Sequence, residues 1–413
     1  MTAAPAFGAR ILDLADRLSE WSDTPDGLTC LYMTAAHRAV AAQLHDWMTA
    51  AGMRTGIDAI GNVVGRYEAA DPAAKTLILA SHYDTVRNAG KYDGRLGVLA
   101  PLVVVEHLHR SGRRLPFHID VIAFSEEEGV RFATTFIGSK PLVGRFDPQV
   151  LELRDMAGLR LADVIREAGG NPAAIPALAR RPEQLLGYIE VHIEQGPVLL
   201  KENLPVGIVT SIAGHVRRLM VITGLAGHAG TVPMALRHDA AAAAAEIVLA
   251  VERRCSGVAT LVGTVGMLSV PDAAINVIAG RCELSLDIRA SDDATRDAAL
   301  ADIESAIALI AARRGVTVET KEIARAPAVP CSVRLQALLR DAVAATGVRP
   351  LGLPSGAGHD AMMFDGVTEM SMLFVRCGNG GISHSPLETI TAEDADVAAR
   401  VLLNAIDGLE LNR

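Results

Sequence analysis

Cysteine is scarce in this chain of 413 residues, and its five copies lie far apart without any Cys-x-x-Cys pair. They are Cys30, Cys255, Cys282, Cys331 and Cys377. An odd number of scattered cysteines suggests neither a disulfide framework nor a zinc site built from thiolates.

The chain has fewer basic than acidic residues, with 39 Lys and Arg and 48 Asp and Glu, for a formal net charge of -9. Phosphate contacts need clustered Lys and Arg, so we expect no nucleic-acid partner. No apolar run is long enough to cross a bilayer, so we expect no membrane partner either. The first ten residues lack a basic segment followed by an apolar core, which predicts a cytoplasmic protein without a signal peptide.

Several common motifs are also missing from the sequence. There is no P-loop, no Gly-x-Ser-x-Gly elbow, no Gly-x-Gly-x-x-Gly after a strand, and no internal repeat. What the chain does have is a hydrophobic content of 50%, enough for a substantial core. Its length predicts about two or three domains.

The N-terminal half alternates between strand and helix patterns. Helices are predicted at 6–20, 34–51 and 96–111, and strands at 62–67, 76–80 and 117–124. This alternation predicts an α/β fold with a mixed, mostly parallel sheet covered on both faces. Ligands of such sheets bind beyond the carboxyl ends of the strands.

The pattern changes between residues 211 and 326. We expect a strand (217–223), a helix (235–254), two strands (259–269 and 277–289), a helix (293–314) and a strand (316–323). This β-α-β-β-α-β order is the ferredoxin-like arrangement. We therefore predict a smaller domain at 211–326, inserted into a larger domain formed by 1–210 and 327–413.

The stretch Ser81-His-Tyr-Asp-Thr-Val-Arg-Asn-Ala-Gly-Lys-Tyr-Asp-Gly94 follows the apolar run at 76–80. His82 lies at the mouth of a predicted buried strand, and Asp84 and Asp93 lie on the polar loop beyond it. By themselves these residues fit two interpretations equally, a surface loop with a helix-capping Asp or half of a metal site.

Other histidines and carboxylates lie in comparable positions. Glu190, His192 and Glu194 alternate on one face of a predicted strand, where polar residues are commonly solvated. His37, His45, His107, His109 and His238 fall on or near helices, and His118 alternates outward on a strand. We interpret these six as surface or partly buried residues without chemistry.

A larger set contains the ligand types of a two-metal hydrolytic site: His82, Asp93, Glu127, Glu128, His192 and His384. Imidazole and carboxylate suit zinc, manganese or cobalt, and one carboxylate can bridge two ions. Asp84, two residues after His82, can accept the second ring N–H and orient the imidazole. The carboxylate beside a ligand carboxylate can serve as general base.

Seven sequence motifs, taken in order along the chain, resemble those of a known family. They are His82-Tyr-Asp-Thr-Val, Tyr92-Asp-Gly, Glu127-Glu-Gly-Val-Arg-Phe132, His192-Ile-Glu-Gln-Gly-Pro197, Gly227-His-Ala-Gly-Thr-Val-Pro-Met234, Ser355-Gly-Ala-Gly-His-Asp-Ala361 and Gly381-Ile-Ser-His-Ser-Pro386. Over nearly its whole length the chain resembles the amidase, hydantoinase and carbamoylase family of dinuclear metal hydrolases. That family includes allantoate amidohydrolases, N-carbamoyl-L-amino-acid hydrolases and β-ureidopropionases.

The resemblance implies a role for each metal-site residue. His82, Asp93 and His192 would hold one divalent ion, and Asp93, Glu128 and His384 the other, with zinc expected first and manganese or cobalt as alternatives. Glu127 would be the general base. A His at position 192 favours the ureido-cleaving branch, because the peptidase and deacylase branches usually carry a carboxylate there.

The resemblance also implies that the inserted domain is a lid and dimerisation domain. His228 would reach the partner subunit's active site and stabilise the oxyanion. Asn276 and Arg289 would hold the substrate carboxylate, and Gln195, Gly358 and His359 would make further substrate contacts. Without the resemblance, Arg289 fits an exposed residue at a strand end.

The chain departs from the family pattern at three positions, where Cys30 replaces a frequent Arg, Val232 a common Thr, and His215 a frequent Gln. None is a predicted ligand, although His215 can affect substrate choice. Arg87-Asn-Ala-Gly-Lys91 and Gly378-Asn-Gly-Gly-Ile-Ser-His384 favour allantoate and a role in purine catabolism. The alternatives are N-carbamoyl-L-amino acids or N-carbamoyl-β-alanine as substrates, and an inactive relative with a binding role.

Overall fold

The computed structural model describes residues 6–411. The prediction that the first ten residues form no signal peptide therefore falls partly outside the described residues. Contacts within the chain define two compact units. Among the described residues, the first contains 6–210, 331–353 and 359–411, and the second contains Ser211–Pro330 and Pro354–Gly358. We describe each unit by itself.

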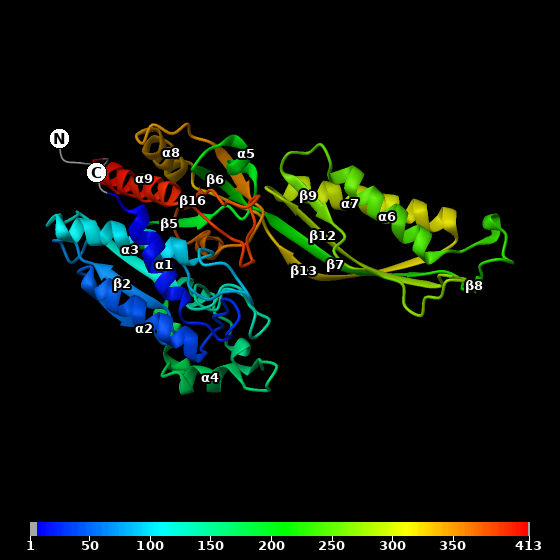
Figure 1. The fold of residues 1–413 in the computed structure, drawn as a ribbon, viewed down its shortest axis with the longest axis horizontal. Helices are drawn as coiled ribbons and strands as arrows, with labels where there is room; N and C mark the ends of the chain where they lie inside the picture. The colour runs from blue at the N-terminus through cyan, green and yellow to red at the C-terminus, as the bar shows by residue number, and fades with distance from the viewer. Residues whose placement is uncertain (1–5, 412–413) are drawn as a thin grey trace. The chain divides into compact units, whose positions relative to one another are not determined.

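The centre of the first unit is a nine-stranded sheet in the order β1-β2-β4-β3-β5-β16-β6-β14, with β15 paired to β6. Figure 1 labels β2, β5, β16 and β6 of this sheet, while β14 and the last residues of β6 and β15 belong to the second unit. The four central strands, β4, β3, β5 and β16, are parallel, whereas β1, β2, β6 and β14 are antiparallel to their neighbours. The strands are β1 (Arg54–Ile57), β2 (Val63–Tyr67), β3 (Thr76–His82), β4 (His118–Phe124), β5 (Leu185–Ile193), β6 (Val206–Ile212), β14 (Val329–Pro330), β15 (Gly352–Ser355) and β16 (Met370–Val375).

Helices pack on this sheet, as predicted. α3 lies on β3 and contacts α1 and α9, while α2 lies on β1 and β2. The helices are α1 (Gly8–Ser19), α2 (Ala35–Ala50), α3 (Arg95–Arg110), α4 (Leu161–Glu167), α5 (Val198–Glu202), α8 (Val333–Ala344) and α9 (Ala392–Leu411). Short 3₁₀ helices are η1 (Lys140–Val143), η2 (Pro148–Glu152), η3 (Pro172–Leu178), η4 (Pro182–Gln184) and η6 (Asp360–Phe364).

Every residue of β3 and β4 is buried. Strands covered on both faces read as continuous apolar runs, which is why these two could be located from the sequence. The same burial overturns the outward placement of His118, which is 5% exposed and accepts a hydrogen bond from the Ala69 N–H at 3.0 Å. The interpretation that Glu190, His192 and Glu194 are solvated is also wrong, because all three residues are buried.

The second unit has a five-stranded antiparallel sheet, in the order β10-β12-β7-β13 with β9 paired to β12. α6 and α7 pack together and against β12, with a separate apolar core between helices and sheet. The elements are β7 (Gly214–Thr223), β8 (Gly227–His228), η5 (Met234–Leu236), α6 (Ala240–Cys255), β9 (Leu261–Thr264), β10 (Leu268–Ser269), β11 (Val277–Ile278), β12 (Arg281–Ala290), α7 (Asp293–Arg314) and β13 (Thr317–Ala326).

The first helix of this unit begins later than predicted. Asp239 caps α6 by accepting hydrogen bonds from the N–H groups of Ala241 and Ala242 at 3.0 and 3.1 Å. An N-cap carboxylate satisfies backbone donors that have no partner inside the helix, so the helix starts after Asp239 and not at 235. Among residues 6–411, no helix is both long and apolar enough to span a membrane.

Candidate metal centre

The predicted ligands gather at the carboxyl edge of the parallel strands. His82 is the last residue of β3, Glu127 and Glu128 follow β4, and His192 is the penultimate residue of β5. His384 lies on the loop after β16. Parallel strands end at the same edge of a sheet, so residues up to about 300 positions apart in sequence meet there.

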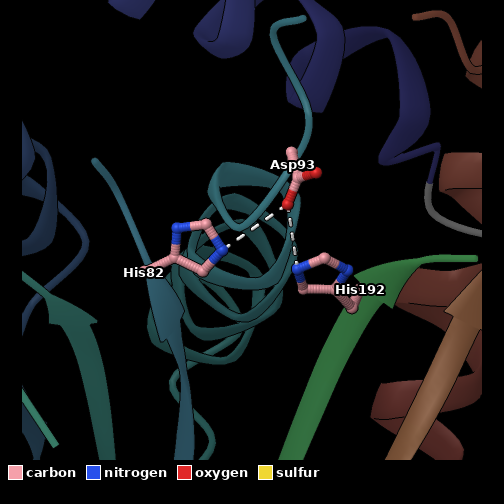
Figure 2. Close-up of side chains that lie close together, drawn as sticks. All are labelled: His82, Asp93 and His192. Atoms are coloured by element: carbon pink, nitrogen blue, oxygen red, sulfur yellow. Dashed lines mark ion pairs between the residues drawn. The ribbon is translucent and has the colours of Figure 1, made fainter. Parts of the chain in front are cut away.

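Asp93 lies at the centre of this group, with its carboxylate directed between two imidazole rings (Figure 2). Its Oδ1 atom is 3.5 Å from Nε2 of His82 and 3.2 Å from Nε2 of His192. Its Oδ2 atom is 3.4 Å from Nε2 of His384, whose Nε2 is also 3.5 Å from Oε1 of Glu128. The two oxygens of one carboxylate therefore face two different sets of ligand atoms.

The hydrogen bonds of the two buried imidazoles fix which ring nitrogen carries the proton. Nδ1 of His192 faces the carbonyl of Ile193 at 2.9 Å, and Nδ1 of His82 faces the carbonyl of Asp84 at 3.2 Å. A carbonyl oxygen can only accept, so Nδ1 is the protonated nitrogen in both neutral rings. Each Nε2 then faces a carboxylate oxygen of Asp93, so a cation belongs between them, either a second proton on the ring or a metal ion.

The spacing of these atoms suits a metal ion. Two ligand atoms, each about 2.0–2.1 Å from a tetrahedral ion, lie about 3.3–3.4 Å apart. The nitrogen–oxygen distances around Asp93 are 3.2–3.5 Å. Oε1 of Glu128 is buried and has no hydrogen-bond partner, which leaves it available as a ligand. The residues present therefore fit two divalent ions on either side of Asp93.

Asp84 contacts both His82 and the segment Ser125-Glu-Glu-Glu-Gly129, which we call the carboxylate turn. Its Oδ1 atom lies 3.3 Å from Nδ1 of His82 and accepts the N–H of Glu127 at 3.1 Å. Its Oδ2 atom accepts the N–H of Glu128 at 3.2 Å. One buried carboxylate thus orients an imidazole ligand and also holds the backbone of the two adjacent glutamates.

Glu127 and Glu128 have perturbed acidities. Burial raises the pKa of Glu127 well above its usual range, and the negative charge of Glu128 adds to this effect, while His82 opposes it. Burial, followed by the charge of Asp93, raises the pKa of Glu128 to about 7. Clustered carboxyl groups with raised pKa values are typical of sites that transfer protons.

Two residues that hold Asp93 were not found from the sequence. Glu388 accepts the N–H groups of Tyr92 and Asp93 through Oε1, at 2.8 and 3.1 Å. Ser383 donates its hydroxyl to Oδ2 of Asp93 and also lies 2.9 Å from Oε2 of Glu388. Both residues lie about 290 positions from Asp93 and belong to no ligand pattern. The Ser in Gly381-Ile-Ser-His-Ser-Pro386 was the only signal.

Gln195 and His359, predicted to contact substrate, lie beside the ligands. Gln195 donates from Nε2 to Oδ2 of Asp93 at 2.8 Å. His359 is 2% exposed, and its ring meets the ring of His192 edge to face at 4.5 Å. Burial lowers the pKa of His359 well below its usual value, so this imidazole is neutral at pH 7.

The other predicted substrate residues belong to the second unit. His228 is exposed in β8, which pairs with β11, and the Ala229 N–H donates to the carbonyl of Asn276 at 2.9 Å. Arg289 donates from Nε and Nη2 to Asp287, both at 3.0 Å, and from Nη1 to the carbonyl of Gly356 at 2.7 Å. Gly358 ends the short segment that contains Gly356.

The three departures from the family pattern lie in different environments. Burial raises the pKa of Cys30 to about 12, opposed by the nearby Arg95, so the thiol stays protonated. Arg95 is fully buried and donates to the carbonyl of Tyr83 at 3.2 Å. His215 pairs across the sheet with Arg289. Val232 packs close to Gly227, because a Cβ atom at position 227 would lie 3.2 Å from Cγ2 of Val232.

His37 corrects the interpretation of the helix histidines as surface or partly buried residues, because it is fully buried. It is 1% exposed, its ring stacks on that of Tyr83 at 4.4 Å, and Nε2 donates to the carbonyl of Ser125 at 2.7 Å. Tyr83 separates His82 from Asp84, and Ser125 begins the carboxylate turn. His37 therefore connects two segments that carry predicted ligands.

The buried state of His37 predicts a pH-dependent stability. Burial lowers its pKa to about 4 from 6.5, so between these values the unfolded chain binds a proton that the folded chain does not. This residue should therefore decrease the free energy of unfolding as the pH falls from 6.5, by about 3 kcal/mol at pH 4. In metal-free protein, urea unfolding should show a stability difference between wild type and His37→Gln that shrinks over this range. A difference independent of pH would contradict this assignment. His45→Gln, at a half-exposed position on the same helix, is the control.

With this geometry established, comparison with known proteins identifies the family. A family model described as peptidase family M20/M25/M40 matches residues 78–408, more than half of the chain. The chain belongs to this family.

The names of its relatives include N-carbamoyl-L-amino acid amidohydrolase and allantoate deiminase. It is 40% identical to an N-carbamoyl-L-amino acid amidohydrolase of Geobacillus stearothermophilus, over 97% of this chain and 98% of that protein. It is 39% identical to a probable allantoate deiminase of Oryza sativa subsp. japonica, over 95% and 87%. The crystal structure of an amidase of the hydantoinase/carbamoylase family from Burkholderia multivorans superposes with a TM-score of 0.92, at 30% identity, covering 98% of this chain and 99% of the other.

These findings confirm the predicted resemblance to amidases and carbamoylases, and with it the prediction that this M20/M25/M40 family member is a hydrolase. The structural neighbour also confirms a mixed α/β fold with a mostly parallel central sheet.

Proposed function

We propose that this protein is a metal-dependent amidohydrolase that cleaves the ureido C–N bond of allantoate to give ureidoglycine, ammonia and carbon dioxide. The observation that carries this proposal is the Asp93 carboxylate, whose two oxygens face separate His and carboxylate ligands at 3.2–3.5 Å. The names of the relatives support ureido chemistry. The relative that is 40% identical makes N-carbamoyl-L-amino acids the second candidate substrate.

Two divalent ions, zinc first among them, would polarise the ureido carbonyl and lower the pKa of water. Glu127 takes a proton from the attacking water and returns it to the leaving nitrogen. Burial raises the pKa of Glu127 above the usual carboxyl range, which favours a group that accepts a proton as base and then returns it as acid. The carbamic acid that leaves breaks down to carbon dioxide and ammonia.

The second unit has the role of a ferredoxin-like lid and dimerisation domain in this proposal. Its succession of strands and helices, β7-α6-β9-β12-α7-β13, supports the arrangement. His228 is exposed, as required of a residue that completes the active site of a partner subunit and stabilises the oxyanion.

Arg289 and Asn276 hold the substrate carboxylate in the proposed complex. A guanidinium suits a carboxylate because it can donate two parallel hydrogen bonds. Arg289 already donates to Asp287, so a substrate carboxylate would share or replace those contacts. His215, across the sheet from Arg289, is placed to affect which carboxylates are accepted.

Steady-state kinetics test the substrate. Allantoate, N-carbamoyl-L-amino acids and N-carbamoyl-β-alanine should be compared with enzyme loaded with zinc or manganese. We expect the highest kcat/KM for allantoate, because the loops at 87–91 and 378–384 resemble allantoate enzymes. A kcat/KM for allantoate far below those of the other substrates would contradict the preference, and turnover of none would favour an inactive binding relative.

Mixed dimers test the role of His228. The Glu127→Gln chain keeps His228, and the His228→Ala chain keeps Glu127. After the two inactive proteins are mixed and subunits exchange, one active site in each mixed dimer should regain both residues and restore activity. No recovery, in a mixture that size analysis shows to contain mixed dimers, would place His228 in its own chain's site or outside catalysis.

A further inference from the structure

Apart from the metal centre, the first unit has a cavity of about 520 Å³ whose walls carry four arginines: Arg54, Arg66, Arg180 and Arg181. Its volume is within the range of pockets that bind small molecules. Neither the metal centre nor the proposed reaction uses these side chains.

A buried carboxylate organises two of the arginines. Asp120 is 1% exposed and accepts hydrogen bonds from Nε and Nη2 of Arg66, at 2.7 and 2.9 Å. Nη2 of Arg180 is 3.2 Å from the same carboxylate. Two partly buried guanidinium groups therefore share one carboxylate. The remaining N–H groups of a guanidinium held in this way are positioned to donate to a second acidic group.

The cavity walls have a surplus of positive charge. Four arginines face only two carboxylates, Asp58 and Asp120. The Asp58 carboxylate is engaged by its own turn, because it accepts the N–H groups of Ile60 and Asn62 at 3.0 and 2.9 Å. Outside the cavity lining, Glu68 pairs with Arg54 and Glu183 with Arg181, but these pairs are exposed, where such contacts contribute little.

We propose that this cavity binds a small organic anion, through a phosphate or carboxylate group that Arg180 and Arg181 contact. Clefts with a surplus of one sign of charge concentrate ions of the opposite sign, and the partly buried guanidinium group of Arg180 is less screened than an exposed one. Ile57, Val64, Leu142 and Leu178 also line the cavity and suit a ligand with a small apolar body.

The proposed site is separate from the metal centre. Asp120 is the third residue of β4, and the carboxylate turn with Glu127 follows the other end of this strand. The four residue steps from Asp120 to Phe124 alone span about 13 Å. Binding in the cavity therefore needs none of the predicted metal ligands.

Titration calorimetry on the full-length, metal-loaded protein tests this proposal, with inorganic phosphate and succinate as probes. The test variants are Arg180→Ala, Arg181→Ala and their combination. Arg180→Ala leaves Asp120 paired with Arg66, and Arg181 is exposed, so both variants should fold, as thermal unfolding can verify. Arg349→Ala, an exposed arginine outside the cavity, is the matched control.

We expect saturable binding of at least one probe, weakened about 10–100-fold in each single variant, further weakened in the double variant and unchanged in Arg349→Ala, since each hydrogen bond to a charged group has this order of effect. Arg180-dependent binding of phosphate alone would identify a phosphorylated ligand, and of succinate alone a carboxylate ligand. Absence of saturable binding of both anions would overturn the proposal. Equal binding by wild type and the double variant would also overturn it, because the probe would then occupy another site.

Discussion

Replacing Glu127 by Gln should lower kcat by about 10²–10⁴-fold, the usual contribution of a general acid–base group, while the metal content stays the same. Gln keeps the size of the side chain but cannot take a proton from water. The backbone of this residue is held independently, because its N–H donates to Asp84. Steady-state kinetics and metal analysis on the same preparation check both parts of the prediction.

Glu126→Gln is the matched control for this substitution. Glu126 precedes Glu127 in the same turn, is 1% exposed, and accepts the N–H of Gly129 at 2.6 Å, a bond that a Gln oxygen can also accept. Burial raises the pKa of Glu126 well above its usual value, so an uncharged side chain suits this position. Activity should persist in Glu126→Gln. Near-normal turnover by Glu127→Gln would refute the base assignment, whereas loss of metal would indicate that Glu127 is a ligand.

Replacing Asp93 by Ala should remove both metal ions and with them the activity. Oδ1 and Oδ2 of Asp93 face the two ligand sets, so each set loses an oxygen when the carboxylate is removed. Burial alone would raise the pKa of Asp93, but hydrogen bonds with His192, His384 and His82 outweigh it and keep the carboxylate ionised. After loading and gel filtration, mass spectrometry should find fewer than one ion per chain.

Variants that lose a ligand from only one of the two sets are the controls for the Asp93 prediction. His192→Ala removes a ligand from the Oδ1 set, and His384→Ala removes one from the Oδ2 set. Each should retain about one ion per chain, and circular dichroism should show that all three variants are folded. Retention of two ions by Asp93→Ala would show that this carboxylate does not bridge them.

The fold was predictable where buried elements have a simple hydrophobic pattern in the sequence. β3 and β4 are covered on both faces and form continuous apolar runs. β1 was missed because Arg54–Ile57 is a short edge strand whose residues are mostly exposed. β6 was missed although it is apolar, because it pairs antiparallel at the far side of the sheet and no motif marks it.

The ligand set could be proposed from residue types at strand ends, because metal chemistry restricts those types to His, Asp, Glu and Cys, and the cysteines of this chain are scattered. The residues that support the ligands were harder to find. Glu388 and Ser383 act on Asp93 from about 290 residues away, and His37 lies on a helix that looks amphipathic and ordinary. Such contacts depend on the folded arrangement, which a local pattern does not contain.

Anomalous diffraction at the metal absorption edge, from crystals of the zinc-loaded protein, tests the central claim most directly. We predict two peaks about 3.5–4 Å apart on either side of the Asp93 carboxylate. One should lie beside His82 and His192, and the other beside Glu128 and His384. A single peak, or two peaks that do not share Asp93, would contradict the account.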